Sequence, residues 1–131
     1  MSNRILDVPA LIDIAAGRTH FMRARWQVAH RTLSTLVVPW CAAAAAARQL
    51  DEDDRRRLVE ALSAPMVVIG SSDAGSAVGC ASMTAAGDRP DWDAAQVVYE
   101  ATQRGWTVVT NEAYLDRLLA LNPLITFERL P

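Results

Sequence analysis

The chain has 131 residues, which is the size of one domain with a single hydrophobic core, so we expect residues 1–131 to form one domain. Hydrophobic residues make up 51% of the sequence and charged residues 21%, a balance that excludes a disordered tail. The net charge of −2 argues against nucleic-acid binding driven by bulk charge, so any such function needs a local basic patch.

Membrane insertion, secretion and metal binding by cysteine have no support in the sequence. No segment approaches the roughly 20 apolar residues of a membrane span, and Asp7 interrupts the first apolar run, unlike a signal peptide. We therefore expect a cytoplasmic protein. Cys41 and Cys80 lie in apolar surroundings without the spacing of a disulfide framework or a zinc site, so they are expected to be reduced thiols.

Short apolar runs alternate with helical patterns along the whole chain. Strands are predicted at residues 4–6, 36–38, 66–69, 107–109 and 124–127. Helices are predicted at residues 8–16, 20–31, 40–49, 53–62, 72–85, 93–104 and 113–120. This alternation predicts an α/β fold with a small central parallel sheet of four or five strands, covered by helices on both faces.

Residues typical of helix ends support these boundaries. Acidic residues at 51–54 are suited to the first turn of a helix, and Gly105 is suited to end one before the strand at 107. The glycine- and serine-rich run at 70–76 follows a strand, as a phosphate-binding loop does. It lacks the lysine of such a loop, so a capped helix start is the better interpretation.

Acidic side chains follow two of the predicted strands and begin one of the helices. Asp7 follows the first strand, Glu112 follows the fourth, and Asp91 and Asp93 lie at the start of the helix before the fourth. Ligands of open parallel sheets bind at the carboxyl ends of the strands, so this is where we expect chemistry.

These segments resemble the PIN-domain family, the fold of VapC-type toxin ribonucleases. The resemblance is best over residues 95–101, Arg104-Gly105-Trp106 and residues 108–112, which are similar to that family's late helix, its glycine and its strand ending in Thr-x-Asp. Ile5-Leu6-Asp7 and residues 36–39 resemble its first two strands. The resemblance implies a three-layer α/β/α fold and four clustered acids that hold Mg²⁺ or Mn²⁺ for attack on a phosphodiester.

The sequence departs from this pattern at several site positions. Residues 42–47 are all alanine where the family has its second acid, and the third acid falls on Ala94. Asp93 comes one residue early, which on a helix is a rotation of about 100°, so its carboxylate is expected to point away unless the helix begins later. Glu112 replaces the usual fourth Asp, and Pro9 replaces a small polar residue.

Two functions are the main candidates, and a third alternative is an unrelated small-molecule role for a domain that shares only the fold. The first is a PIN-like domain that has lost nuclease activity and serves as an RNA-binding or protein-binding regulatory module, with no cofactor and with a toxin–antitoxin lineage as a candidate origin. The alternative is an active ribonuclease in which Asp7, Asp93 and Glu112 still hold Mg²⁺ or Mn²⁺. Each acid also has a structural explanation, since Asp7, Asp91 and Asp93 suit the capping position of a helix start and Glu112 suits the positive end of the following helix.

Positive charge is concentrated between residues 14 and 50, which contain five arginines and no acid. This stretch predicts either a surface for RNA phosphates or an acidic partner, such as a small antitoxin-like protein, or simply a solvated helix face. The candidate binding residues are Arg18, Arg23, Arg25, Arg31 and Trp26. Trp26 is a candidate anchor for a partner or for a homodimer, whereas Trp40, Trp92 and Trp106 are expected to fill the core or an interface.

Overall fold

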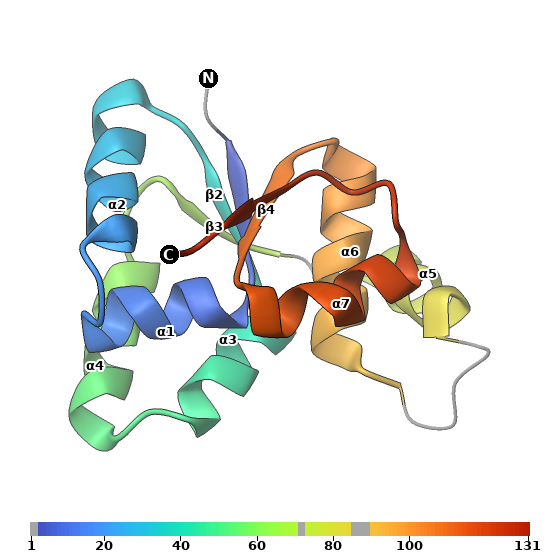
Figure 1. Ribbon diagram of the computed structural model, residues 1–131, viewed down its shortest axis with the longest axis horizontal. Coiled ribbons are helices and arrows are strands. Elements are labelled where there is room, and N and C mark those ends of the chain that lie inside the picture. Colours follow the sequence, from blue (N-terminus) through green and yellow to red (C-terminus); the bar gives the residue numbers. More distant parts are fainter. Residues whose placement is uncertain (1–2, 71–72, 85–89) are drawn as a thin grey trace.

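A computed structural model describes residues 3–70, 73–84 and 90–131 and gives an α/β fold around one sheet of five parallel strands (Figure 1). The strand order is β3-β2-β1-β4-β5, so the chain starts in the middle of the sheet and extends it in both directions. The strands are β1 (Arg4–Leu6), β2 (Leu36–Pro39), β3 (Val67–Gly70), β4 (Thr107–Thr110) and β5 (Phe127–Arg129). The predicted fold class is confirmed.

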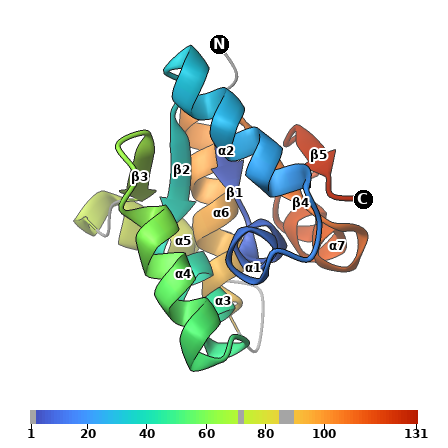
Figure 2. The same ribbon diagram turned by 90° about the vertical axis from the view of Figure 1, so that its left-hand side faces the viewer.

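Helices cover both faces of the sheet and so make three layers (Figures 1 and 2). One layer contains α1 (Val8–Ala16), α2 (Phe21–Thr32) and α4 (Glu52–Leu62). The other contains α5 (Ala74–Thr84), α6 (Trp92–Arg104) and α7 (Glu112–Leu121). Helix α3 (Trp40–Arg48) packs against both α1 and α6 at the edge of the sheet where the strands end.

The central strands form the core because both of their faces are covered. Val37 and Val38 of β2 and Val108 and Val109 of β4 are completely buried, as is Leu6 between them in β1. Strands buried on both sides need apolar residues at every position, which explains why these runs do not alternate with polar residues.

Side chains and glycines at helix ends fix where the chain turns. Asp7 begins α1, and Gly17 and Gly105 end α1 and α6 with φ of 65° and 68°, a backbone conformation that favours glycine. The prediction for Gly105 is confirmed. Asp13, only 6% exposed, accepts hydrogen bonds from the backbone N–H groups of Thr19 and Met22 and thereby joins α1 to α2.

Several predicted boundaries were wrong. The last strand comprises Phe127–Arg129 rather than 124–127, and Leu124 is 87% exposed. Helix α6 begins at Trp92, one residue before the predicted start, because the Asp91 carboxylate accepts a hydrogen bond from the N–H of Ala94 at 3.2 Å. The predicted helix at 72–85 begins and ends on residues outside the described part of the chain, as do Ser71 and Ser72 of the glycine- and serine-rich run. Its described part forms α5.

Candidate functional site

Asp7 lies at the carboxyl end of β1 and is completely buried. Its carboxylate accepts hydrogen bonds from the N–H of Val8 at 2.8 Å and from the hydroxyl of Thr110, at the end of β4, at 2.7 Å. The two strands are neighbours in the sheet, with Leu6 paired to Val109, which places Asp7 next to Thr110. Parallel pairing therefore places these two polar side chains next to each other at the carboxyl edge of the sheet.

The charge partner of Asp7 is Arg117 of α7. The guanidinium Nη2 lies 2.5 Å from Oδ1 of Asp7, and its Nη1 lies 3.2 Å from Oδ1 of Asp93. The same guanidinium lies over the ring of Tyr114, 4.9 Å from the ring centre. Stacking on the aromatic face one turn earlier in the helix holds the side chain in place between the two carboxylates. One arginine therefore links both acids.

The expectation that Asp93 points away from the site was wrong. Asp91 takes the capping position, so Asp93 lies in the first turn of α6 and its carboxylate faces Arg117. Ala94, the position expected for the third acid, is instead completely buried in the core. The Asp93–Arg117 contact is an ion pair without hydrogen-bond alignment, since neither Asp93 Oδ1 nor Arg117 Nη1 has a hydrogen-bond partner among the described residues.

Burial dominates the electrostatics of both acids. It raises the pKa of Asp7 above its usual value, although Arg117, Thr110 and Val8 act in the opposite direction. The pKa of Asp93 is raised to about 7 by burial first, and then by its hydrogen bond with Asp91. The same hydrogen bond lowers the pKa of Asp91. The interaction between Asp91 and Asp93 thus shifts the pKa values of the two groups in opposite directions.

Glu112 is not part of this cluster. It occupies the first turn of α7, and its carboxylate, 79% exposed, pairs with Arg129 of β5 at 3.1 Å. The position agrees with the structural explanation, in which an acid stabilises the positive end of a helix. The structure brings Asp7 and Asp93 together and leaves Glu112 in solvent.

The arrangement does not fit the Mg²⁺ or Mn²⁺ site implied by the resemblance. Such an ion needs several carboxylate oxygens facing one point, whereas Asp7 and Asp93 both face the guanidinium of Arg117 and Glu112 faces Arg129. Across the residues that the structure describes, no three carboxylate, histidine or cysteine side chains form a group suited to a metal ion.

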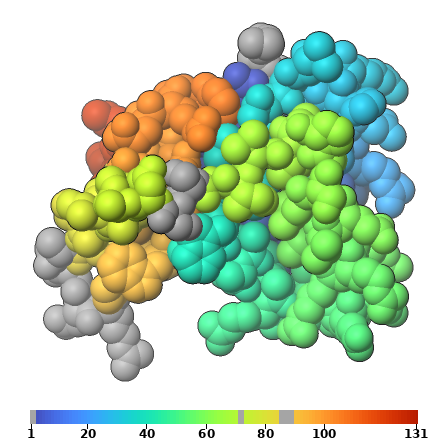
Figure 3. Space-filling model, turned by 180° about the vertical axis from the view of Figure 1, so that it is seen from behind, coloured from blue at the N-terminus to red at the C-terminus, as the bar shows by residue number. Residues whose placement is uncertain are grey.

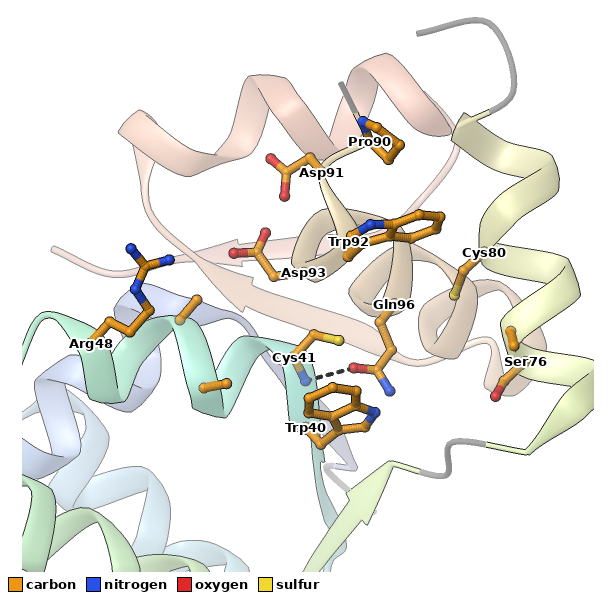
Figure 4. A pocket seen from close by; sticks show the side chains of 13 residues that line it. Trp40, Cys41, Arg48, Ser76, Cys80, Pro90, Asp91, Trp92, Asp93 and Gln96 are labelled. Carbon is orange, nitrogen blue, oxygen red and sulfur yellow. Dashed lines mark hydrogen bonds between the residues drawn. The ribbon is translucent and has the colours of Figure 1, made fainter. Parts of the chain in front are cut away.

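A pocket of about 810 Å³ adjoins the acids, between α3, α5 and the start of α6 (Figure 4). The space-filling view from behind shows the surface hollowed between α3, in teal, and the start of α6, in gold (Figure 3). Ala44 and Ala45 of the alanine run line this pocket together with Asp93. The position where a family member would carry its glutamate is therefore close to the acids, but here it presents methyl groups.

Two of the tryptophans are more exposed than expected. Trp40 is 47% exposed and Trp92 49%, and both line the pocket instead of filling the core. Trp106 and Trp26 are partly buried and pack against the core. Since Trp26 contributes to the packing of α2, its predicted role as an exposed anchor has no direct support in the structure.

The predicted basic surface follows α2 and the turn before it. Arg18, Arg23 and Arg31 are exposed, whereas Arg25 is half-buried and pairs with Glu128, which also binds Arg4 at 3.0 Å. The ion pair of Arg25 therefore connects α2 to β5. The other three arginines are exposed and can contact a ligand or partner.

Sequence reasoning missed Arg117. A single arginine in an amphipathic helix gives no signal by itself, because most such residues are solvated. One indication was available in the spacing, since Arg117 lies three residues after Tyr114 and four before Leu121, both of which pack against the core. Asp91 was assigned correctly as a capping residue.

Comparisons with known proteins support the fold. No family model matches the sequence, and no curated protein matches it either. Among solved structures, the chain is similar to one in the crystal structure of VapBC2 from Rickettsia felis bound to a DNA fragment from its promoter. The TM-score is 0.67, 96% of this chain and 97% of that chain are covered, and the sequences are 12% identical. The likeness shows the fold, which is a PIN-like three-layer α/β/α arrangement.

No helix among the described residues has the length and apolar character needed to cross a lipid bilayer.

Proposed function

We propose that this protein is a PIN-like domain that has lost metal-dependent nuclease activity and acts as an RNA-binding or protein-binding regulatory module. The observation that carries the proposal is the guanidinium of Arg117 between Asp7 and Asp93. Its positive charge neutralises the carboxylates that would otherwise attract a divalent ion. In this arrangement the counter-charge of the two acids is an arginine of the protein and not a metal ion.

The solvent-exposed arginines of the α2 region supply the binding surface in this proposal. Arg18, Arg23 and Arg31 are exposed, and residues 14–50 contain no acid to pair with them. Such a surface attracts RNA phosphates or an acidic segment of a partner protein. Arg25 and Trp26 then act indirectly, by fixing the position of α2.

The likeness to a VapBC2 chain supports a toxin–antitoxin lineage for the module, with a small antitoxin-like protein as a candidate partner. In this proposal the domain keeps partner binding after nuclease activity is lost, because one fold can carry different functions. A homodimer, a cytoplasmic location and a single domain over residues 1–131 belong to the same proposal.

The alternative is a ribonuclease that uses Asp7, Asp93 and Glu112 to hold Mg²⁺ or Mn²⁺. This requires Arg117 to leave two carboxylates and Glu112 to leave Arg129. Because removing a partner from a buried charge is costly, the binding module is the better-supported function.

A cleavage assay separates the two. Single-stranded RNA is incubated with the protein and Mn²⁺, with Asp7→Asn as the inactive control and the exposed Asp116→Asn as the matched control. We expect no Mn²⁺-dependent cleavage by the unmodified protein. Cleavage that Asp7→Asn abolishes and Asp116→Asn retains would contradict the proposal and establish the ribonuclease.

A further inference from the structure

The pocket beside the acids has two exposed aromatic walls. Trp40 begins α3 and Trp92 begins α6, and Figure 4 shows their indoles on either side of Gln96. About half of each tryptophan is exposed. Large aromatic side chains lose stability when left in water, so two that line one pocket indicate a surface to which a flat ligand can bind.

The polar groups of the pocket are few and specific. Only 4% of Gln96 is exposed, and its Oε1 accepts a hydrogen bond from the N–H of Cys41 at 2.8 Å. Among the described residues none accepts a hydrogen bond from its Nε2 group, so the pocket offers a ligand a donor whose position is held by the Oε1 contact. The carboxyl groups of Asp91 and Asp93 line the same pocket and supply acceptors.

The charged groups around the pocket have both signs. Arg48 of α3 lines it together with Asp91 and Asp93, and the carboxylate of Asp93 faces Arg117. A lining of this kind does not favour a ligand with a large charge of one sign. Arg48 at the rim is placed to contact a phosphate attached to a ligand whose neutral part enters the pocket.

We propose that this pocket binds one unpaired nucleobase, which stacks on the exposed indole of Trp40 or Trp92, accepts a hydrogen bond from Gln96 and donates to Asp91 or Asp93. A nucleobase has two flat apolar faces and an edge that carries both donors and acceptors. An apolar side chain from a partner protein lacks that edge and would bury the Gln96 donor without a partner, which is unfavourable. The inference rests on the RNA-binding form of the proposed function and makes it specific.

The test is a binding titration in EDTA, so that cleavage plays no part. Fluorescence anisotropy of labelled single-stranded hexaribonucleotides of A, C or U is compared with that of a hexamer of abasic ribose phosphates. Nucleoside monophosphates are titrated separately by tryptophan quenching. We expect the abasic strand to bind at least about tenfold more weakly, since base stacking on an aromatic side chain contributes 1 to 3 kcal/mol and 1.4 kcal/mol corresponds to tenfold.

Three variants locate the base. Trp40→Ala, Trp92→Ala and Gln96→Glu each change a pocket residue, and Gln96→Glu retains the acceptor for Cys41 while removing the donor. Leu124→Ala, which removes an exposed side chain outside the pocket lining, is the matched control. We expect about tenfold weaker RNA binding in at least one tryptophan variant, a changed base preference in Gln96→Glu, and no change in Leu124→Ala. Circular dichroism confirms that each variant is folded.

Each outcome decides the inference. If monophosphates bind as tightly as hexamers, the base comes from free nucleotides, and if only hexamers bind, it comes from RNA; both support a base pocket. Equal binding of abasic and normal strands, unchanged RNA binding in all three pocket variants, or no binding of any nucleotide would overturn it. The proposed loss of nuclease activity fails separately, through cleavage in Mn²⁺.

Discussion

Asp7, at the carboxyl end of β1, and Glu112, at the start of α7, are the two acids at positions that resemble the acid pattern of PIN domains. Their environments are opposite. Asp7 is completely buried and paired with Arg117, whereas the Glu112 side chain is 79% exposed and paired with Arg129. A buried ion pair cannot exchange its partner for water without a large desolvation cost, but an exposed pair can. The comparison shows that the partner of each acid, and not its position in the sequence, decides whether it could bind a metal.

The largest expected effect comes from the buried region. Asp7→Asn keeps the size of the side chain and removes the charge that faces Arg117. We expect a loss of about 3 kcal/mol in the free energy of unfolding, because the amide replaces one of two buried oxygens that accept hydrogen bonds from Val8, Thr110 and Arg117 with a donor, and Arg117 keeps only Asp93 as its partner. Urea denaturation measures it, with Asp116→Asn on the exposed side of α7 as the control. A change below about 0.5 kcal/mol, the size of an ordinary surface substitution, would show that the pair contributes little.

Arg117→Met tests the same pair from the cationic side. It leaves Asp7 and Asp93 without a counter-charge, so both take up protons more readily in the folded state than in the unfolded state. The free energy of unfolding should then fall as pH rises above about 4, with a loss of about 2 kcal/mol at pH 8 that shrinks at pH 4. Urea titrations at several pH values measure this. A loss that does not vary with pH would indicate packing rather than charge.

Asp93 should make the unmodified protein pH-dependent as well. Its pKa of about 7 lies above the usual 3.8, so the folded protein holds a proton that the unfolded protein has released between these values. Stability from this group is therefore greatest below pH 4 and is lost as pH rises toward 7, by about 1 kcal/mol after allowance for solvent screening. Asp93→Asn should flatten this slope. If the free energy of unfolding of Asp93→Asn depends on pH as steeply as that of the unmodified protein, another group causes the dependence. Asp7 is then the first candidate, because its pKa is raised too.

The smallest effect is expected for the exposed acid, Glu112. Glu112→Gln removes a surface pair with Arg129, and such pairs contribute about 0 to 1 kcal/mol. We expect a change below about 0.5 kcal/mol that disappears at high salt, measured by thermal denaturation. A larger loss would mean that Glu112 has a buried role that its exposure does not reveal.

Much of the fold follows from the sequence because strand runs and capping residues act locally. The apolar runs at β1, β2 and β4 and the glycine at 105 identify their elements directly. The predicted start of the last strand was three residues too early, because Leu124 and Ile125 are as apolar as a strand requires. Only the tertiary structure shows that Leu124 is exposed and Ile125 is buried.

The site was only partly predictable. Asp7 could be found because it directly follows a strand at the edge where ligands bind. Arg117 could not, because its role depends on the distance between α7 and α6, which no local pattern encodes. The orientation of Asp93 was missed for a related reason: it depended on whether Asp91 or Asp93 takes the capping position, and a one-residue difference turns the side chain by about 100°.

The most direct test of the account is a calorimetric titration of Mn²⁺ into the unmodified protein and into Arg117→Ala. If Arg117 neutralises the acids, the unmodified protein should give no binding heat, while Arg117→Ala should bind Mn²⁺ and lose that binding when Asp7→Asn is added. Binding by the unmodified protein that Asp7→Asn abolishes would contradict the account, because it would mean that the carboxylates accept a metal ion with Arg117 present.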